Sequence, residues 1–564
     1  MNYKERYQAW LEDDFFDEAT RRELLDIQGD EREMEDRFYT SLAFGTAGLR
    51  GKLGAGLNRM NPYTVGAACE GLARFIEKQG EEAKKRGVSI AYDVRHGSLE
   101  FAEESAEILA AHGIHAYLHK DICPTPVLSY TVRETGSFAG IMVTASHNPK
   151  EYNGYKVYNG FGSQILDQWA VAIEKEIAGL GHYREIQRMP LQEALEKGLV
   201  DYVQEDLWES YYSDVLSLTI HDKSIDKGVK LVYTPLNGCG NHPVRHILQA
   251  RGFEKVYVVE EQADPDPDFT TVGYPNPEDP KVFAYAEKLG REKEADLLFA
   301  TDPDSDRCAM EVRNEQGDYV FFNGNKIGAL LGHYVLSQRK DKGTLPSNAA
   351  VIKSIVTGDL LFSIARDYGV HCMEVLTGFK NIAEPVNEWD QTHEYEYVFG
   401  FEESIGYNPS QFIRDKDAVS SAMLILEMAA YYKAQGKTLL EVLEEIYQQY
   451  GYHNDRLIST VLEGVDGIER MGRIMEEFRQ NPLEEIGGMK LVETIDYAHD
   501  DTGLSPSNVL RYFYDDGSWY AIRPSGTEPK IKVYLYTVGQ SLQESEEKLQ
   551  AFAQATADVF QLVR

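Results

Sequence analysis

The chain has 564 residues, of which 43% are hydrophobic and 26% charged, a composition typical of a soluble protein with several domains. With 57 basic and 92 acidic residues, the net charge is −35. This excludes nucleic acid or an anionic membrane as the main partner, because both bind cationic surfaces.

The predicted elements begin with a charged, helical segment over residues 1–40, which we expect to be a surface extension. The glycine-rich segment Phe44–Lys52 follows it. A first unit of alternating strands and helices then comprises a strand Val88–Tyr92, a helix Ser98–Ala111, a strand Ile114–Leu118, a helix Thr125–Glu134 and a strand Phe138–Val143.

The same order occurs twice more. The second unit comprises a strand Val229–Tyr233, a helix Pro243–Arg251, a strand Val256–Val259, a helix Pro280–Leu289 and a strand Asp296–Ala300. The third comprises a strand Ala350–Ile355, a helix Gly358–Tyr368, a strand Cys372–Val375, a further helix and a strand Tyr395–Phe399. This alternation predicts parallel βαβ units, with a polar loop after the last strand of each.

The C-terminal part has a different pattern. Its apolar runs Trp519–Ile522 and Ile531–Tyr536 predict strands, and Leu542–Phe560 predicts a closing helix with a capping box of Ser541 and Glu544. We therefore expect four domains, with boundaries at 1–204, 205–318, 319–450 and 451–564. The last is a smaller α+β domain.

Cysteine usage and apolar runs indicate a cytoplasmic protein. The five cysteines are widely spaced and form no CxxC pair, so we expect neither a disulfide framework nor a zinc site. The N-terminus lacks the apolar segment of a signal peptide. The longest apolar stretch, 418–434, is interrupted by Ser420, Ser421 and Glu427, which predicts a buried helix and no membrane span.

The loop Asp302–Arg307 carries aspartates at positions 302, 304 and 306 directly after an apolar run. Carboxylates on alternate residues can converge on one hard cation such as Mg²⁺. This loop does not match a calcium-binding EF-hand loop. An EF-hand needs Gly at its sixth position and Glu at its twelfth, and Arg307 and Arg313 stand at these positions here. A phosphatase with Asp302 as its nucleophile is an alternative.

The loop Thr144–Pro149 presents the Ser146 hydroxyl, with His147 and Asn148 beside it. A serine needs a base or a metal to act as a nucleophile, whereas a phosphoserine next to Mg²⁺ can donate its phosphoryl group. Lys156 is our candidate for the general acid or base.

Two further loops suit parts of a phosphosugar. Arg523, Ser525, Gly526 and Thr527 combine a guanidinium, hydroxyls and a glycine, which suits a phosphate clamp. The loop Gly400–Ser404 has no cation, so Glu402 and Ser404 suit hydrogen bonding to sugar hydroxyls. Arg50 alone fits either a phosphate contact or a surface charge.

With these motifs, the chain resembles the α-D-phosphohexomutase superfamily, in particular the phosphoglucomutase/phosphomannomutase branch with its bacterial phosphoglucomutases and phosphopentomutase-like enzymes. The resemblance covers about residues 40 to 540 and rests on five motifs in the family's order: Phe44–Gly51, Thr144–Pro149, Asp302–Arg307, Gly400–Ser404 and Arg523–Pro529. It implies an α/β fold of three similar domains, with mixed sheets flanked by helices, and a smaller C-terminal α+β domain, around a central active-site cleft.

The resemblance also implies the roles of the candidate residues. Ser146 would be the phosphoserine, and its phosphate would bind Mg²⁺ together with Asp302, Asp304 and Asp306. Arg50, His147 and Lys156 would serve catalysis. The expected substrate-binding residues are Arg307, Lys380, Glu402, Ser404, Arg523, Ser525, Gly526 and Thr527. Lys380 lies in a loop with Phe379 where some relatives have Trp, so the sugar preference is open.

The implied function is that of an isomerase, an intramolecular phosphotransferase that interconverts glucose 1-phosphate and glucose 6-phosphate. The cofactors would be Mg²⁺ and glucose 1,6-bisphosphate, and the partner a small phosphosugar. Alternatives are a phosphopentomutase, a phosphomannomutase, a phosphatase or a non-catalytic phosphosugar-binding protein. We expect a monomer or a homodimer.

Overall fold

The computed structural model describes the chain except residues 1, 46–47, 463, 501, 525–529 and 564, and the side chains of 464–466 and 468. The chain divides into two compact units. Unit 1 holds Met1–Asn323, Ala383–His393 and Ser404–Gln435, and unit 2 holds Gly324–Ile382, Glu394–Glu403 and Gly436–Arg564. The predicted α/β class is confirmed, and each unit is described by itself.

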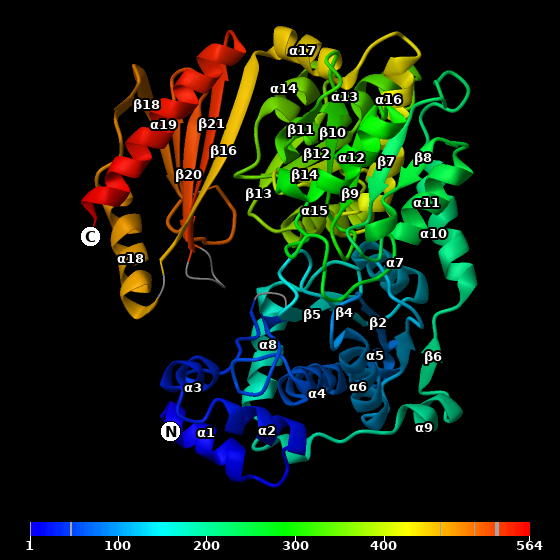
Figure 1. The fold of residues 1–564 in the computed structure, drawn as a ribbon, viewed down its shortest axis with the longest axis vertical. Coiled ribbons are helices and arrows are strands. Elements are labelled where there is room, and N and C mark those ends of the chain that lie inside the picture. Colours follow the sequence, from blue (N-terminus) through cyan, green and yellow to red (C-terminus); the bar gives the residue numbers. More distant parts are fainter. Residues whose placement is uncertain (1, 46–47, 463, 501, 525–529, 564) are drawn as a thin grey trace. The chain divides into compact units, whose positions relative to one another are not determined.

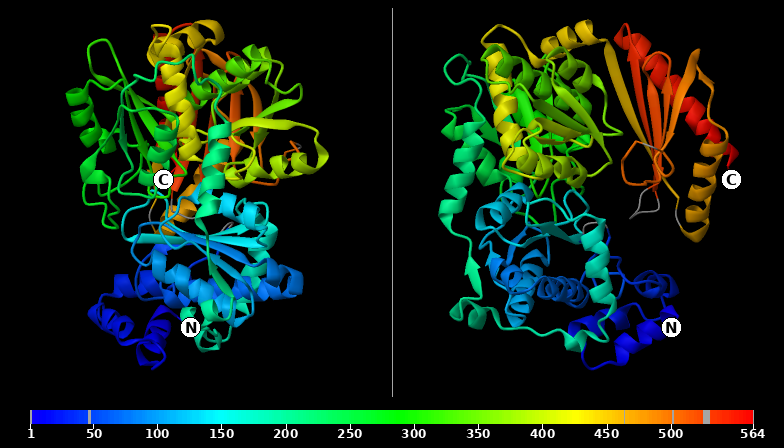
Figure 2. Two further views of the ribbon diagram at one scale, coloured as in Figure 1. Left: turned by 90° about the vertical axis from the view of Figure 1, so that its right-hand side faces the viewer. Right: turned by 180° about the vertical axis from the view of Figure 1, so that it is seen from behind.

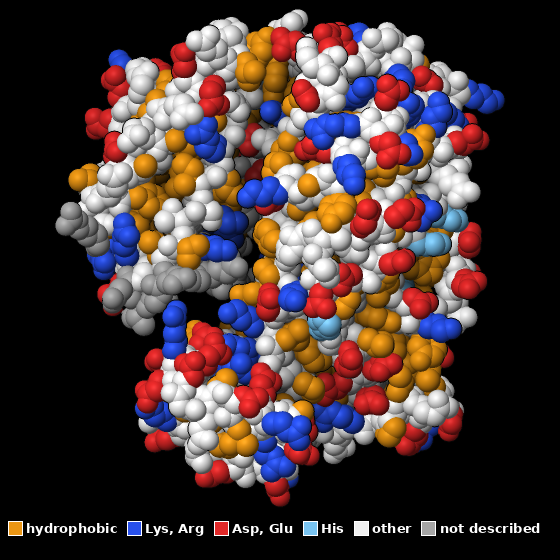
Figure 3. Space-filling model, viewed as in Figure 1, with side chains coloured by type: hydrophobic (Ala, Val, Ile, Leu, Met, Phe, Trp, Pro, Cys, Tyr) orange, Lys and Arg blue, Asp and Glu red, His pale blue; other side chains and the backbone are white. Residues whose placement is uncertain are grey.

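The predicted N-terminal extension is helical, with α1 (Tyr3–Glu12), α2 (Glu18–Asp26) and α3 (Glu31–Phe38). The helices are capped by Asn2, Asp17 and Asp30, whose side chains accept hydrogen bonds from N–H groups of the first turn. Tyr7 and Trp10 of α1 and Phe38 of α3 form a small aromatic core together with Phe16 and Tyr63, which lie outside these helices. Acidic side chains, with basic ones among them, lie on the outer face of this segment (Figure 3).

The first sheet of unit 1 has the strand order β1-β5-β4-β2-β3-β6. Strands β2, β3, β4 and β6 run parallel, whereas β5 is antiparallel to both β4 and β1. The bounds are β1 (Gly48–Lys52), β2 (Val88–Tyr92), β3 (Ala116–Leu118), β4 (Ala139–Val143), β5 (Tyr152–Asn159) and β6 (Val200–Tyr202). The sheet is therefore mixed, as expected, although the antiparallel return β5 was not predicted from the sequence.

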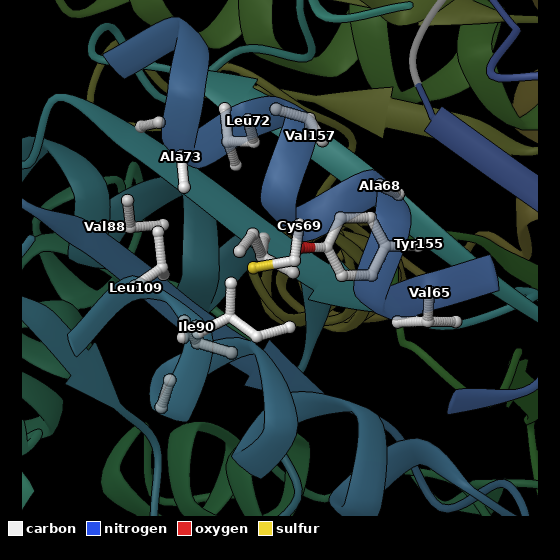
Figure 4. Packing of buried hydrophobic residues seen from close by; sticks show 14 of the residues in the cluster. Val65, Ala68, Cys69, Leu72, Ala73, Val88, Ile90, Leu109, Tyr155 and Val157 are labelled. Carbon is white, nitrogen blue, oxygen red and sulfur yellow. The ribbon is translucent and has the colours of Figure 1, made fainter. Parts of the chain in front are cut away.

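Helices flank this sheet (Figures 1 and 2), and α4 packs against α6 and α8. The bounds are α4 (Pro62–Gln79), α5 (Glu81–Arg86), α6 (Ser98–Ala111), α7 (Thr125–Thr135), α8 (Asp167–Ala178), η1 (Tyr183–Glu185), α9 (Leu191–Glu196) and α10 (Glu205–Ser217). Figure 4 shows the core between them, where Cys69 and Tyr155 lie among Val65, Leu72 and Ile90. Burial raises the pKa of the Cys69 thiol to about 12.

All five cysteines lie among the described residues, and none forms a disulfide. Four are buried and Cys372 is half-buried.

The second sheet of unit 1 has the order β11-β10-β9-β7-β8 and is also mixed. Its strands are β7 (Leu231–Thr234), β8 (Val256–Val258), β9 (Leu297–Thr301), β10 (Cys308–Arg313) and β11 (Tyr319–Phe322). The accompanying elements are α11 (Asn241–Ala250), η2 (Glu260–Gln262), η3 (Pro280–Phe283), α12 (Ala284–Lys293), β15 (Gly406–Asn408) and α16 (Ala418–Lys433).

Helix α16 packs against α11, and nearly all of its residues are buried, as the sequence predicted. Within the described part of the chain, no helix is both long and apolar enough to cross a membrane.

Unit 2 begins with α13 (Gly324–Asp341), followed by β12 (Ala349–Ser354), which pairs in parallel with β13 (His371–Val375) and β14 (Glu396–Glu402). Helices α14 (Leu360–Asp367) and α17 (Leu439–Tyr450) pack against α13. Helix α15 (Phe379–Thr392) contributes residues to both units.

The smaller C-terminal domain is an antiparallel sheet of order β16-β21-β20-β19-β18-β17. Its elements are β16 (Tyr452–Val461), α18 (Gly464–Gln480), β17 (Glu485–Ile486), β18 (Met489–Asp496), β19 (Leu510–Tyr514), β20 (Trp519–Pro524), β21 (Lys530–Gly539) and α19 (Leu542–Leu562). The predicted capping box of α19 is half formed. Ser541 Oγ accepts the N–H of Glu544 at 3.2 Å, but the Glu544 carboxylate accepts the N–H of Gln540.

Candidate active site

Ser146 lies in the loop at the carboxyl end of β4. Its φ of 52° is in the left-handed region, which is uncommon for a residue other than glycine and is often found at functional sites. The Ser146 N–H donates to Thr144 Oγ1 at 2.8 Å, and the side chain is buried. The hydroxyl is therefore held in one place by the local turn.

The buried ion pair of Asp93 and Arg95 holds this loop in place through hydrogen bonds. The Arg95 guanidinium donates to four carbonyls of the loop and the chain after it, those of Ser146, Asn148, Pro149 and Tyr152. Asp93 lies 3.2 Å from Arg95 Nε and accepts the Thr144 hydroxyl at 2.6 Å. Neither Asp93 nor Arg95 was predicted from the sequence, because each is a single charged residue outside any recognised motif.

The three aspartates of the second loop converge as predicted. Asp302, Asp304 and Asp306 lie between β9 and β10, are all buried, and can each place one carboxylate oxygen within 4.8 Å of the others. Ser305 has a φ of 51°, so the chain turns sharply inside the loop. Such a set of hard oxygen donors matches the ligand preference of Mg²⁺.

The two loops meet directly in unit 1. Ser146 Oγ donates to Asp302 Oδ2 at 2.7 Å, and His147 Nδ1 lies 3.3 Å from the same hydroxyl. The predicted nucleophile or phosphate carrier is thus in contact with one of the predicted metal ligands, Asp302.

Cations and hydroxyls surround the carboxylates. Lys156 lies on strand β5, and its Nζ is 3.0 Å from Asp304 Oδ2, which also accepts the Thr125 hydroxyl at 2.8 Å. Lys416 Nζ lies 3.2 Å from Asp306 Oδ2 and 2.9 Å from Asp415 Oδ1. Thr125 and Lys416 were not predicted from the sequence, since no short motif connects either residue to the loop.

The pKa values of Asp302 and Asp304 are shifted in opposite directions. Burial, together with the neighbouring Asp304 and Asp306, raises the pKa of Asp302 well above its usual value. Although burial opposes ionisation of Asp304, Lys156 and the hydrogen bonds to this carboxylate lower its pKa. Oδ1 of Asp304 and Oδ1 of Asp306 are buried and accept no hydrogen bond from any described residue. Buried carboxylate oxygens without donors fit a site that takes a divalent cation.

The other predicted cations of unit 1 lie around the same loops. Arg307 donates from Nη1 to the Ser404 carbonyl at 3.1 Å, which brings these two predicted substrate-binding residues together. Arg50, in the glycine-rich segment, is on strand β1 and is opposite Gly154 of β5. Burial, then Arg307 and Arg50, lower the pKa of His147 well below its ordinary value.

The remaining predicted residues belong to unit 2. Glu402 ends β14 and accepts the Gly378 N–H at 2.7 Å, and Lys380 is two residues further along the chain from Gly378, in α15. The adjacent Glu403 accepts the Thr357 hydroxyl at 2.8 Å, which fixes this loop. Arg523 is half-buried near the end of β20, whereas Ser525, Gly526 and Thr527 lie outside the described residues.

Mixed α/β domains, a smaller antiparallel domain, and a serine hydrogen-bonded to one of three clustered, buried aspartates are the features of the α-D-phosphohexomutase class. The chain belongs to the phosphoglucomutase/phosphomannomutase family. Its alpha/beta/alpha domains I, II and III match residues 41–184, 209–316 and 323–450, and its C-terminal domain matches residues 468–558. The domain boundaries given above remain predictions.

Among the relatives is a phosphoglucomutase of Staphylococcus aureus (strain USA300), 39% identical over 533 residues that cover 92% of this chain and 94% of the relative. The open form of parafusin (phosphoglucomutase) from Paramecium has a similar fold, with a TM-score of 0.68 at 19% identity over 93% of this chain and 95% of that one. So does the N-acetylphosphoglucosamine mutase of Aspergillus fumigatus in complex with GlcNAc-6P and magnesium, with a TM-score of 0.52 at 14% identity, covering 92% and 96%.

Proposed function

We propose that the protein is a phosphoglucomutase, which interconverts glucose 1-phosphate and glucose 6-phosphate through a phosphoserine enzyme and glucose 1,6-bisphosphate. The observation that carries this proposal is the 2.7 Å hydrogen bond from Ser146 to Asp302, at the edge of a buried carboxylate triad. The phosphoglucomutase of S. aureus, at 39% identity over most of both chains, supports this substrate.

In the proposed reaction, phosphorylated Ser146 is the donor. The bond between phosphorus and Ser146 Oγ breaks while phosphorus bonds to a sugar hydroxyl oxygen, and the proton of that hydroxyl passes to a base. Lys156 is our candidate for this base, since its Nζ lies at the triad, 3.0 Å from Asp304. The bisphosphate then presents its other phosphate, which returns to Ser146 by the reverse steps.

Asp302, Asp304 and Asp306, with an oxygen of phospho-Ser146, would hold Mg²⁺. When bound, the ion withdraws negative charge from the transferring phosphoryl group. The two buried carboxylate oxygens without hydrogen-bond donors fit this assignment. The A. fumigatus N-acetylphosphoglucosamine mutase, which has a similar fold, was crystallised with magnesium and GlcNAc-6P.

The remaining residues would bind and orient the substrate. Glu402 would accept hydrogen bonds from sugar hydroxyls, and Ser404 would exchange hydrogen bonds with them. Lys380 would also bind the substrate. Arg523, Ser525, Gly526 and Thr527 would hold the phosphate that is not reacting. Arg50, Arg307 and His147 would surround the transferring group, where cations stabilise developing negative charge. We further propose a cytoplasmic monomer or homodimer.

The test is a panel of phosphosugars assayed with Mg²⁺ and a catalytic amount of glucose 1,6-bisphosphate. We expect a higher kcat/KM for glucose 1-phosphate than for mannose 1-phosphate or ribose 1-phosphate. Preference for ribose 1-phosphate would make the protein a phosphopentomutase. Mapping of the covalent phosphate to Asp302 in place of Ser146 would make it a phosphatase.

A further inference from the structure

A cavity of about 800 Å³ lies in unit 1, away from the carboxylate triad. Its walls come from α1, the segment 40–44, β1, α4, α8 and the segment 180–183. Small-molecule sites usually measure roughly 300–1,000 Å³. Part of the wall, including α1, lies before residue 41, where the match to the phosphoglucomutase/phosphomannomutase family begins. None of the residues that line the cavity belongs to the catalytic site described above.

The lining is mainly apolar. Trp10 and Phe16 come from the N-terminal extension, and Phe44, Leu49 and Ile177 from the elements that follow it. Leu49 is the residue before Arg50 on β1, so an occupant would touch the strand that carries a proposed catalytic cation. Such a lining favours a ligand with an apolar ring system.

Arg6 gives the cavity a cationic end. Its Nη1 donates to the carbonyls of Phe38 and Tyr39, at 3.2 and 2.9 Å. Its Nη2 and Nε donate to no described residue, and no described carboxylate forms an ion pair with it. A half-buried guanidinium without an acidic partner can bind an anionic group of a ligand.

The carboxylates that line the cavity do not neutralise Arg6. Asp13 accepts hydrogen bonds from the Phe15 N–H, Arg184 and His182, and these contacts lower its pKa to about 2. Its charge is therefore matched within the protein. The other carboxylate, Glu174, is on α8 and exposed to solvent.

We propose that this cavity is a binding site for a small amphipathic anion, with its ring system against Trp10, Phe16 and Phe44 and its negative group at Arg6. The inference concerns binding alone, so it does not depend on the proposed mutase activity.

The test uses two fluorescent probes on the full-length protein. 1-Anilinonaphthalene-8-sulfonate is an apolar anion, and N-phenyl-1-naphthylamine is its uncharged counterpart. We expect the wild-type protein to bind the anion at one site. Arg6→Gln should weaken binding of the anion about fivefold, the size of one partly exposed ion pair, and leave binding of the uncharged probe within about twofold. Arg6→Lys should restore most of the loss.

A second variant locates the site. Ala9→Trp places an indole at the exposed edge of the lining and should abolish binding of both probes. Ala19→Trp, on the exposed face of α2 and outside the lining, is the matched control and should bind as the wild type does. Equal weakening of both probes by Arg6→Gln, unchanged binding in Ala9→Trp, or no binding by the wild type would each overturn the proposal. Thermal unfolding checks that each variant is folded.

Discussion

Thr125 holds both the main chain and the side chain of Asp304. Its N–H donates to the Asp304 carbonyl at 2.9 Å, and its hydroxyl donates to Asp304 Oδ2 at 2.8 Å. Since 179 residues separate the two along the chain, this contact joins the domain of Ser146 to the triple-aspartate loop. The hydroxyl donates to Oδ2 alone. Oδ1 of Asp304 accepts no hydrogen bond from any described residue, and it can therefore act as a metal ligand.

Thr125→Val removes the side-chain bond and keeps both the shape and the main-chain bond. Loss of a hydrogen bond to a metal ligand typically weakens metal affinity about 10- to 100-fold, and we expect a loss of this size for Mg²⁺, measured by calorimetric titration. Thr125→Ser retains the hydroxyl and should bind Mg²⁺ nearly as the wild type does. Unchanged affinity in Thr125→Val would show that this contact does not orient the ligand.

Gly238 allows a second segment to approach the triple-aspartate loop. A Cβ at this position would lie 2.5 Å from Pro303 Cα, and the next residue, Cys239, donates its N–H to the Pro303 carbonyl at 2.8 Å. Because backbone atoms would have to move, Gly238→Ala should displace the loop. We expect weaker Mg²⁺ binding and a loss of about 1–3 kcal/mol in the free energy of unfolding.

The matched control is Gly472→Ala. Gly472 lies on α18, where a Cβ would meet nothing within 4 Å. Alanine is the better helix former, so this variant should be as stable as the wild type or more so, with unchanged Mg²⁺ binding. If Gly238→Ala behaves like this control, close packing against Pro303 is not required for metal binding.

Ser146→Ala removes the proposed carrier of the phosphoryl group. We expect loss of mutase turnover and loss of covalent phosphate, measured by a coupled assay and by mass spectrometry of the intact protein. Ser459→Ala, an exposed serine on β16, is the control and should retain both. Near-normal turnover in Ser146→Ala would exclude the phosphoserine mechanism.

Local sequence patterns predicted some elements to the residue. The strand β2 (Val88–Tyr92) and the helix α6 (Ser98–Ala111) have the bounds expected from their apolar periodicity. Strand β5 (Tyr152–Asn159) was missed, because its conformation depends on pairing with both β1 and β4 more than on its own residues. This strand places Lys156, which was predicted from the sequence, beside Asp304.

In the site, too, local motifs could be predicted from the sequence, whereas contacts from distant residues could not. Ser146 and the three aspartates could be proposed from short motifs, because each motif brings its polar groups together within one loop. Arg95, Thr125 and Lys416 contact these loops from distant parts of the sequence. Only the folded chain brings such single residues to the site, so no sequence pattern identified them.

Glu311 provides a test of pH dependence away from the active site. It lies on β10 with 3% of its surface exposed, and its Oε2 accepts no hydrogen bond from any described residue. Burial, and then the nearby Glu287, raise its pKa from 4.5 to about 7. A folded-state pKa above the unfolded value means that stability is fully present below pH 4.5 and falls as the pH rises toward 7.

Glu311→Gln cannot ionise, so it should lack this loss. Its free energy of unfolding relative to the wild type should rise between about pH 4.5 and 7 and reach a gain of about 1–3 kcal/mol at pH 8, measured by urea denaturation across the range. Glu315→Gln, at an exposed position just after β10, is the control and should follow the wild type at every pH. A constant difference between Glu311→Gln and wild type from pH 4.5 to 8 would show that Glu311 does not titrate in this range.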